Sequence, residues 1–243
     1  MIETYKVLVT TSGTGSRLKE ITKNETNKAL VEINGKAVVD HIVDLYDASI
    51  EIVVTLGYFG DKVREHLVKK YPDRKFTYVE VDKFEGPGSS LGYSMLCAKQ
   101  YLDCPFIFHC NDTIVAGKIP SPVEYNWNGG SKGDDSEVYN TTHYSSFLIN
   151  SEGNVGSIMQ KGAENFDLFH IGLVGLKDHQ LFWDELQTAY DLNPSDTSLN
   201  DVIAINSMLG KGIAFKAVEF SSWYDTGNMD GFNHTIRSLE QKI

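Results

Sequence analysis

The sequence predicts an α/β protein whose central sheet is mixed, largely parallel and flanked by helices. Strand and helix signals alternate through the first half of the chain, which is typical of parallel strands joined by crossover helices. A glycine-rich turn, Gly13-Thr14-Gly15, directly follows the first apolar run. The length of 243 residues and the hydrophobic content of 41% suffice for one large domain, so we expect a single domain spanning 1–243.

Short apolar, β-branched runs predict the strands of the first half, and apolar residues at helical spacing predict the helices between them. The expected strands are Tyr5–Thr11, Glu51–Leu56, Lys75–Val81 and Pro105–His109. The expected helices are Val38–Tyr46, Gly60–Lys70 and Ser89–Tyr101.

The second half begins with a change of composition. The segment 118–142 is rich in Gly, Ser, Asn and Asp, which favours a surface loop or a flexible flap. After it, two short runs around the turn Ser151-Glu152-Gly153 predict a hairpin of Tyr144–Asn150 and Asn154–Gln160. The remaining expected elements are a strand at Ile171–Leu176, helices at His179–Tyr190 and Ser198–Leu209, a strand at Gly212–Val218 and a helix from Met229.

Charge and cysteine content exclude several classes of protein. The formal net charge of −11 argues against a nucleic acid partner, because phosphate backbones need a basic surface. The three cysteines, Cys97, Cys104 and Cys110, form neither an even disulfide framework nor a metal-ligand spacing, which favours a reducing, cytoplasmic compartment. The N-terminus lacks the features of a signal peptide, and no run of about 18 apolar residues predicts a membrane span.

The turn after the first strand carries the first functional signal. It reads Thr10-Thr11-Ser12-Gly13-Thr14-Gly15-Ser16-Arg17-Leu18. Glycines let the main chain turn sharply and direct several N–H groups at one ligand, which suits phosphate. Arg17 and Lys28 add two cations to an acidic chain, so the combination predicts a triphosphate site. Leu18 stands where the dinucleotide fingerprint has its third glycine, so that fingerprint is not met.

This opening resembles the signature of the sugar-1-phosphate nucleotidyltransferases, L-A-A-G-x-G-T/S-R-L followed by P-K-A-L/M. The second part reads Asn27-Lys28-Ala29-Leu30 here. The sequence departs from the signature at Thr10-Thr11-Ser12, in place of Leu-Ala-Ala, and at Asn27, in place of Pro. Neither departure removes a charged group, although both could change how the loop fits the nucleotide.

Three later segments extend the resemblance in order along the chain. Gly86-Pro87-Gly88-Ser89-Ser90-Leu91 corresponds to the small-residue turn beside the base. Phe106–Asp112 corresponds to the strand that ends in a metal-binding Asp, and Trp223-Tyr224-Asp225-Thr226-Gly227 corresponds to W-x-D-x-G, which brings the second carboxylate. We therefore expect Asp112 and Asp225 to hold Mg²⁺, a hard cation that prefers oxygen ligands.

Two acceptor motifs of the family are only partly kept. The E-K-P motif reads Gln160-Lys161-Gly162, so the lysine that contacts the sugar phosphate is present and the glutamate that helps hold the sugar is not. The N-A-G-I-Y-like strand reads His170-Ile171-Gly172, of which only the glycine carries over. These departures concern recognition of the sugar hydroxyls more than catalysis.

The resemblance implies a Rossmann-like fold of the nucleotide-diphospho-sugar transferase type, with a nucleotide-binding half (about 1–112) and an acceptor-binding half (about 113–243). It implies catalytic roles for Arg17 and Lys28 and metal binding by Asp112 and Asp225. It implies nucleotide binding by Thr11, Ser12, Gly13, Thr14, Gly15, Ser16, Gly88 and Ser89, and acceptor binding by Lys161 and Gly172.

The reaction implied by the resemblance joins an NTP to a sugar 1-phosphate with release of pyrophosphate, for the synthesis of a surface polysaccharide. Two alternatives stay open: cytidylyl transfer to a non-sugar phosphate or phosphonate such as phosphocholine, and a catalytically silent regulator that binds a nucleotide-sugar. A metal-dependent glycosyltransferase would use a D-x-D pair, which Asn111-Asp112-Thr113 is not. The expected partners are small molecules, with no nucleic acid and no membrane, and a homo-oligomer is compatible with the sequence.

Overall fold

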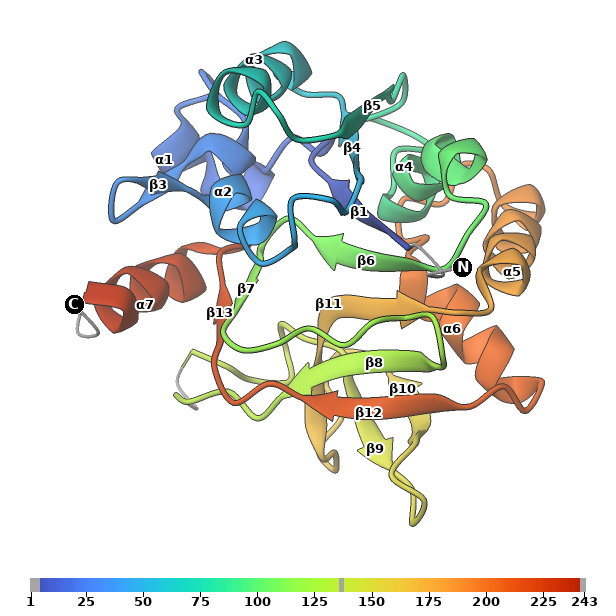
Figure 1. Ribbon diagram of the computed structural model, residues 1–243. Coiled ribbons are helices and arrows are strands. Elements are labelled where there is room, and N and C mark those ends of the chain that lie inside the picture. The colour runs from blue at the N-terminus through green and yellow to red at the C-terminus, as the bar shows by residue number, and fades with distance from the viewer. Residues whose placement is uncertain (1–4, 136–137, 241–243) are drawn as a thin grey trace.

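The computed structural model describes residues 5–135 and 138–240, which form a nine-stranded mixed sheet with helices on both faces (Figure 1). The strand order is β10-β9-β11-β6-β1-β4-β5, and β8 and β12 extend the sheet beyond β11. In Figure 1 the parallel strands β1, β4 and β5 occupy the upper part and β8 and β12 the lower part, with β6 and β11 between them. The predicted α/β class is confirmed.

The first half of the chain supplies the parallel part of the sheet. Its strands are β1 (Lys6–Thr10), β4 (Ile52–Leu56), β5 (Phe76–Glu80) and β6 (Phe106–Cys110). β1 pairs in parallel with both β4 and β6, and β4 pairs in parallel with β5. The strands predicted from apolar runs are therefore confirmed, with ends that differ by at most one residue.

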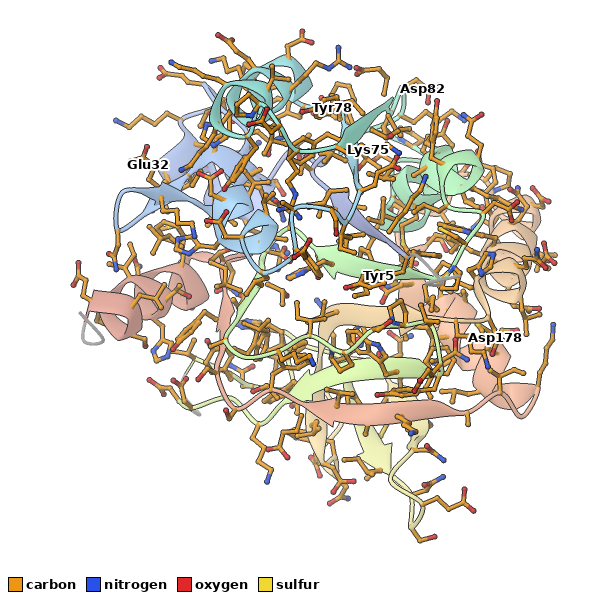
Figure 2. The ribbon with its side chains drawn as sticks, viewed as in Figure 1. Tyr5, Glu32, Lys75, Tyr78, Asp82 and Asp178 are labelled. Carbon is orange, nitrogen blue, oxygen red and sulfur yellow. The ribbon has the colours of Figure 1, made fainter. Side chains whose placement is uncertain are left out.

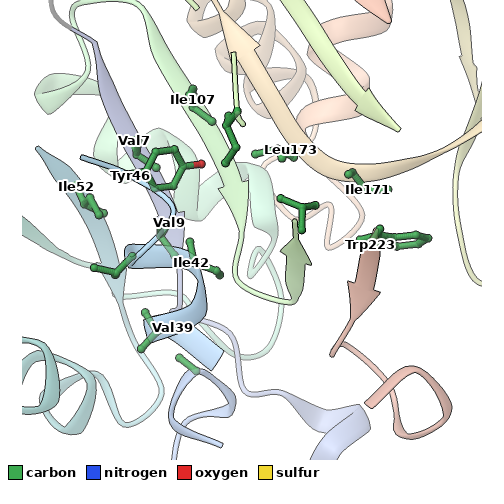
Figure 3. Close-up of a cluster of buried hydrophobic side chains, with 14 of the residues drawn as sticks. Val7, Val9, Val39, Ile42, Tyr46, Ile52, Ile107, Ile171, Leu173 and Trp223 are labelled. Atoms are coloured by element: carbon green, nitrogen blue, oxygen red, sulfur yellow. The ribbon is translucent and has the colours of Figure 1, made fainter. Parts of the chain in front are cut away.

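Helices cover the two faces of this sheet unequally. The α-helices are α1 (Lys19–Thr22), α2 (Val38–Val43), α3 (Gly60–Lys70), α4 (Leu91–Ala98), α5 (His179–Leu192), α6 (Asp201–Gly210) and α7 (Met229–Glu240). Apolar side chains of α2 and α3 pack on one face, and those of α4, α5 and α6 pack on the other. Figure 3 shows the first of these clusters, in which Val39 and Ile42 of α2 lie near Val9 of β1.

The helix predicted at Ser89–Tyr101 is shorter than expected. It begins after Ser90, whose hydroxyl accepts the Tyr93 N–H at 3.0 Å, as an N-cap residue does. It ends at Ala98 and continues as a 3₁₀ turn, Lys99–Tyr101. Ser89 therefore lies in the loop before the helix.

The second half of the chain pairs mainly antiparallel. β11 (Leu168–Leu176) runs antiparallel to β6, and the predicted hairpin is present as β9 (Ser146–Ile149) and β10 (Val155–Met159). β12 (Phe215–Glu219) lies at the far side of β8. Two small sheets were not expected from the sequence: β7 (Thr113–Val115) with β13 (Trp223–Asp225), and β2 (Glu32–Ile33) with β3 (Lys36–Ala37).

The prediction of a surface loop over 118–142 is wrong for its central part. Asn126–Ser131 form β8, which is buried along its whole length between β11 and β12. A Cβ on Gly130 would lie 2.5 Å from the Phe147 ring, and one on Gly129 would lie 2.7 Å from the Leu173 carbonyl oxygen. Glycine is present here because the neighbouring strands and their side chains approach closely, not because the segment turns. Residues 136 and 137 of this segment lie outside the described residues.

The side chain of Asn126, the first residue of β8, is hydrogen-bonded inside the protein. The Asn126 side chain donates to Asp178 Oδ2 at 2.6 Å and accepts the Asp178 N–H at 2.9 Å. Figure 2 shows Asp178 beside the end of the strands that include β8. A buried amide bonded in this way is compatible with a central strand.

At the other margin of the sheet, β5 is an edge strand beside charged side chains. Lys75, directly before β5, pairs with Glu51, and Figure 2 shows Lys75 and Tyr78 near this edge. Charged residues at an edge oppose pairing with another chain. Within residues 5–135 and 138–240, no helix combines the length and the apolar character needed to cross a bilayer.

Candidate functional site

The turn after β1 is shaped around Lys28. Gly15 adopts the left-handed conformation (φ +63°), and a Cβ at this position would lie 3.2 Å from Lys28 Cβ. Glycine is therefore needed both for the backbone angle and for the close approach. A 3₁₀ turn, Ser16–Leu18, follows and presents the Arg17 side chain on the surface.

The hydroxyl residues at the start of this turn bind the protein itself. Thr11 donates to the Thr55 carbonyl oxygen at 2.7 Å, and the Ser12 hydroxyl lies 2.8 Å from that of Ser94 in α4. Both residues are buried. Thr11 thus ties the turn to β4, and Ser12 ties it to the helix opposite.

Asn27 holds Lys28 in place. Its side-chain amide donates to the carbonyl oxygens of Thr11 (2.8 Å) and Tyr58 (2.6 Å), and its oxygen accepts the Ala29 N–H (2.8 Å). Asn27 is fully buried and caps the 3₁₀ turn Lys28–Leu30. The residue that departs from the family's Pro therefore joins three segments around the predicted catalytic lysine.

Lys28 forms an ion pair with Asp112, the residue two positions after β6. Lys28 Nζ lies 2.8 Å from Asp112 Oδ2, and only about 15% of each side chain is exposed. Burial alone would raise the pKa of Asp112, but the Lys28 ammonium, together with hydrogen bonding from Cys110, holds it well below the usual range. Burial would likewise lower the pKa of Lys28, and the Asp112 carboxylate outweighs it, so the net shift is upward.

Cys110 completes the surroundings of Asp112. Burial raises the pKa of the Cys110 thiol well above its usual value, and the nearby Asp112 charge adds to this. The thiol is therefore protonated at neutral pH, and it donates to Asp112 Oδ1 at 2.8 Å. A protonated, buried thiol is a poor nucleophile.

Asp225, at the end of β13, is held by neutral donors. Tyr144 Oη donates to Asp225 Oδ2 at 2.9 Å, Asn228 Nδ2 donates to the same oxygen at 2.6 Å, and the Gly227 N–H donates to Oδ1 at 3.1 Å. Burial and the neighbouring Asp112 charge raise the pKa of Asp225 to about 6, even though these hydrogen bonds oppose the shift.

The fold brings the two carboxylates together although they are far apart in the sequence. Asp225 pairs with Thr113 in the β7–β13 ladder, and the Thr226 N–H donates to the Asp112 carbonyl oxygen at 2.8 Å. A Cβ on Gly227 would lie 2.8 Å from Asp112 Oδ2 and 3.1 Å from Asp225 Oδ1, so both oxygens flank one small space. Two carboxylates in this arrangement fit Mg²⁺, which binds one or two protein carboxylates and completes its shell with phosphate and water.

Two cavities meet at Asp112. The larger cavity, about 340 Å³, is lined by the turn after β1 and the start of α4. The smaller cavity, about 190 Å³, is lined by residues of β11, β13 and the start of α6. Both are lined by Arg17, Leu91, Cys110 and Asp112. Two ligands placed in them would meet beside the Lys28–Asp112 pair.

Comparison with known proteins finds curated nucleotidyltransferases that are similar to this chain. No family model matches the chain. A curated relative, the low-salt glycan biosynthesis nucleotidyltransferase Agl11 of Haloferax volcanii, is 29% identical over 235 residues. The match covers 91% of this chain and 62% of the relative. The N-acetylmuramate alpha-1-phosphate uridylyltransferase of Caulobacter vibrioides is 47% identical over 62 residues, a quarter of each chain.

The fold comparison covers the whole chain. The solved structure of the CTP:phosphocholine cytidylyltransferase of Streptococcus pneumoniae superimposes with a TM-score of 0.78 and 17% identity, over 97% of this chain and 99% of that one. The relatives and the solved structure are nucleotidyltransferases, and the sequence resembles the sugar-1-phosphate nucleotidyltransferase family. The sheet of this chain is that of the nucleotide-diphospho-sugar transferases, as the resemblance implied.

Of the residues expected to bind the nucleotide, some line the larger cavity and others lie outside its lining. Ser12, Gly13, Thr14 and Ser89 line the larger cavity, together with the expected catalytic residues Arg17 and Lys28. Thr11, Gly15, Ser16 and Gly88 do not line it. Gly88 instead permits close packing, since a Cβ there would lie 2.9 Å from the Pro194 carbonyl oxygen.

Both acceptor residues expected from the family motifs line the smaller cavity. Lys161 is exposed, on the loop after β10. Gly172 has φ +67°, and a Cβ there would lie 2.7 Å from Cys110 Cβ, so this glycine lets β11 approach the turn that carries Asp112. His170, which stands where the family motif has Asn, also lines the smaller cavity.

Sequence reasoning missed several polar residues of the site. Tyr144 binds Asp225, His170 binds Asp201, and Ser94 binds Ser12. Phe84 adds the aromatic side chain that lines the larger cavity. Of these, Phe84 alone carried a local signal, because it lies two residues before the Gly86–Leu91 turn. The others are brought to the site by pairing of distant strands and helices.

Proposed function

We propose that the protein is an enzyme that transfers a nucleotidyl group from an NTP to a sugar 1-phosphate, yielding an NDP-sugar and pyrophosphate. The observation that carries the proposal is the pair of cavities that meet at Asp112, with Lys28 on one side and Asp225 on the other. The larger cavity and the turn after β1 would take the nucleotide, and the smaller cavity would take the acceptor. The division into a nucleotide half (about 1–112) and an acceptor half (about 113–243) follows from this.

The chemistry needs positioning and positive charge rather than a general base. An oxygen of the acceptor phosphate, already ionised near neutral pH, attacks the α-phosphorus in line, and the bond to the oxygen that bridges to the β-phosphate breaks. Pyrophosphate leaves with that electron pair. In such reactions fixed cations and dipoles supply most of the rate enhancement.

The proposed roles follow from where each cation lies. The N–H groups of the turn and Arg17 would hold the β- and γ-phosphates. Lys28 would neutralise the α-phosphate, for which its ammonium leaves Asp112. Lys161 would neutralise the incoming monophosphate from the loop that lines the smaller cavity.

Asp112 and Asp225 are the residues that would hold Mg²⁺. When bound there, the ion supplies positive charge to the triphosphate and the departing pyrophosphate. Asp225 must be ionised to bind it, and a pKa of about 6 makes this carboxylate available at neutral pH. Lys28 keeps Asp112 ionised until the ligands arrive.

The biological setting is proposed from the relatives. The name of the H. volcanii relative refers to glycan biosynthesis, which supports synthesis of a precursor for a surface polysaccharide. This chain spans only about 62% of that relative, so the substrates of the relative are not assigned to this chain. Cys97, Cys104 and Cys110 are free thiols, which supports a cytoplasmic enzyme.

A second acceptor class has an observation in its favour. Tyr144 and Trp223 line the smaller cavity with carboxylates beside them, and such an arrangement can bind a quaternary ammonium group. The cytidylyltransferase with the same fold acts on phosphocholine. Phosphocholine therefore belongs in any test of the acceptor.

The experiment is a matrix of ATP, CTP, GTP, UTP and dTTP against hexose 1-phosphates and phosphocholine, with Mg²⁺ and pyrophosphate release as the readout. The proposal expects release that depends on one NTP, one sugar 1-phosphate and Mg²⁺. Release with phosphocholine instead would establish the second class. Binding of a nucleotide-sugar with no release from any pair would show a catalytically silent regulator.

A further inference from the structure

A chain of three polar side chains crosses the protein beneath the smaller cavity. His170 of β11 has its Nδ1 3.0 Å from Asn128 Oδ1 of β8 and its Nε2 3.1 Å from Asp201 Oδ2 of α6. Asn128 is fully buried, and less than a tenth of the His170 and Asp201 side chains is exposed. The three elements are joined here by side chains as well as by packing.

This row of three hydrogen-bonded side chains ends at the cavity wall. His170 and Asp201 both line the smaller cavity, whereas Asn128 lies behind them in the sheet. The Asn128 amide is oriented by its own hydrogen bond from Nδ2 to the Gly129 carbonyl oxygen at 3.3 Å. The imidazole is thus held from behind, and the carboxylate in front of it has one oxygen bound to the ring.

Asp201 also sits at a fixed point of the backbone. It is the first residue of α6, directly after the N-cap residue Asn200, whose side chain accepts the Ile203 N–H at 3.4 Å. A carboxylate in the first helical turn is favoured by the helix dipole. The helix, the cap and His170 together restrict where its two oxygens can point.

This carboxylate and the proposed metal ligands come from different elements around one cavity. In Figure 1, α6 and the β7–β13 pair lie on opposite sides of β11. Asp112 and Asp225 belong to the β7–β13 side, and both they and Asp201 line the same cavity of about 190 Å³. An acceptor whose phosphate lies beside Asp112 would turn its other end to Asp201.

We propose that Asp201, held by His170 and Asn128, binds hydroxyl groups of the acceptor and so determines which acceptors are used. The inference rests on the proposed function and deepens it. An ionised carboxylate only accepts hydrogen bonds, and it can accept one on each oxygen, which suits two adjacent hydroxyls of a sugar ring. Gln160 replaces the glutamate expected for sugar binding, and Asp201 supplies a carboxylate in its place.

His170 and Asn128 are positioning residues in this account. If the His170 imidazole is replaced by another side chain, the Asp201 carboxylate stays in the cavity wall but loses the partner that orients its Oδ2. The expected effect is a rise in KM for the acceptor that is smaller than the rise caused by neutralising Asp201 itself. Loss of a merely structural contact would instead lower stability without selecting one substrate.

The test measures KM for the acceptor and KM for the NTP in wild type, Asp201→Asn and His170→Gln. Each is assayed with the hexose 1-phosphate that the wild type uses best and with its deoxy analogues, each lacking one ring hydroxyl. We expect Asp201→Asn to raise KM for the parent acceptor about tenfold or more and to leave KM for the NTP unchanged. His170→Gln should raise the same constant less.

The deoxy analogues separate recognition from structure. With the analogue that lacks the recognised hydroxyl, wild type and Asp201→Asn should have similar KM values, because the interaction is already gone. Glu185→Gln is the matched control, since Glu185 bonds Ser207 and Lys211 of the α6 region but does not line the cavity. Its acceptor KM should equal that of wild type.

Three results would overturn the inference. One is an unchanged acceptor KM in Asp201→Asn; another is an equal rise for the parent and every deoxy analogue; the third is phosphocholine as the acceptor that Asp201→Asn loses. In the first two cases pyrophosphate release with a sugar 1-phosphate shows that the proposed function stands, and in the third the second acceptor class replaces it. Absence of release from every NTP and acceptor pair would refute the proposed function, and the inference with it. If Asp201→Asn does not fold, as judged by its unfolding midpoint, His170→Gln carries the same comparison.

Discussion

The two cavities are built in different ways. The larger one is lined mainly by segments that directly follow β1 and β5, so its residues are near neighbours in the sequence. The smaller one is lined by residues from β6, β11, β13, α6 and the loops before β9 and after β10. Its members meet only because strands that are distant in the sequence pair with one another.

They also differ in how charge is held. At the larger cavity, the cations Arg17 and Lys28 stand beside a turn rich in N–H groups, which suits any triphosphate. At the smaller cavity, the carboxylates Asp201 and Asp225 are each bonded to specific neutral or ring donors. In the proposed function, the triphosphate end would supply the transfer chemistry and the acceptor end would supply the selectivity for the acceptor.

The largest effect should come from Asp225, which lines the smaller cavity and is one of the two proposed metal ligands. Asp225→Asn keeps the hydrogen bond from Tyr144 but removes the charge. We expect kcat for pyrophosphate release to fall by a factor of 10² or more, corresponding to about 3 kcal/mol. Asp230→Asn, an exposed carboxylate at the start of α7, should leave kcat unchanged. Normal turnover by Asp225→Asn would mean that the acceptor side does not hold the metal.

The buried position of β8 gives the next prediction, because β8 carries the Asn128 support of the acceptor cavity. Gly130→Ala would place a methyl group against the Phe147 ring, at 2.5 Å in the present structure. We expect the free energy of unfolding to fall by about 2 kcal/mol, measured by urea denaturation. Gly156→Ala in β10, where a Cβ would have an ordinary contact at 3.6 Å, is the control. Equal stability of both variants would favour a loop at 126–131.

The turn shared by both cavities should respond to pH through His109. This fully buried ring accepts from Tyr46 Oη on Nδ1 (2.7 Å) and donates from Nε2 to the Thr113 carbonyl oxygen (2.8 Å). Burial lowers the pKa of His109 to about 4, below the 6.5 of an unfolded histidine. The unfolded state therefore binds more protons between these values, and the stabilisation present above pH 6.5 is lost as pH falls toward 4.

The measurement is urea unfolding at pH 7 and at pH 5 for wild type and His109→Gln. Wild type should lose about 2 kcal/mol more than the variant between the two values. The comparison uses the difference between the two proteins, so carboxylates common to both cancel. Parallel losses would show that His109 is not a neutral, buried ring that supports the Asp112 turn.

The smallest effect concerns metal binding in the absence of nucleotide. Lys28 occupies one oxygen of Asp112, so it competes with a divalent cation for that carboxylate. Lys28→Met should therefore bind Mn²⁺ about tenfold more tightly than wild type without NTP, measured by calorimetry, although its kcat is reduced. Lys19→Met, which removes an exposed charge from α1, should bind as wild type does. Weaker Mn²⁺ binding by Lys28→Met would contradict this competition.

The difference between the cavities also explains what could be predicted from the sequence. The parallel strands and the turn around Gly15 follow from local signals: apolar runs, glycines and neighbouring cations. Local signals misassigned β8, because Gly129 and Gly130 resemble a turn unless the neighbouring Leu173 and Phe147 are known. The His170–Asp201 pair, formed across β11 and α6, carries no signal within either segment.

Asn27 marks the limit of reasoning from motifs. As a departure from the family's Pro it was uninformative in the sequence. In the structure its three hydrogen bonds join Thr11, Tyr58 and the turn of Lys28. The roles proposed for the metal-binding carboxylates are predictions that the Asp225 and Lys28 variants address.

Direct transfer between the two cavities is the central claim, and stereochemistry at the α-phosphorus tests it most directly. The substrate is an NTP with one sulfur on the α-phosphorus in a single configuration, and the configuration of the product is determined by phosphorus NMR. The account predicts inversion, because the acceptor phosphate attacks in line and the thiol of Cys110, which lines both cavities, is protonated. Retention of configuration would show a nucleotidyl group passed first to the protein, and it would contradict the account.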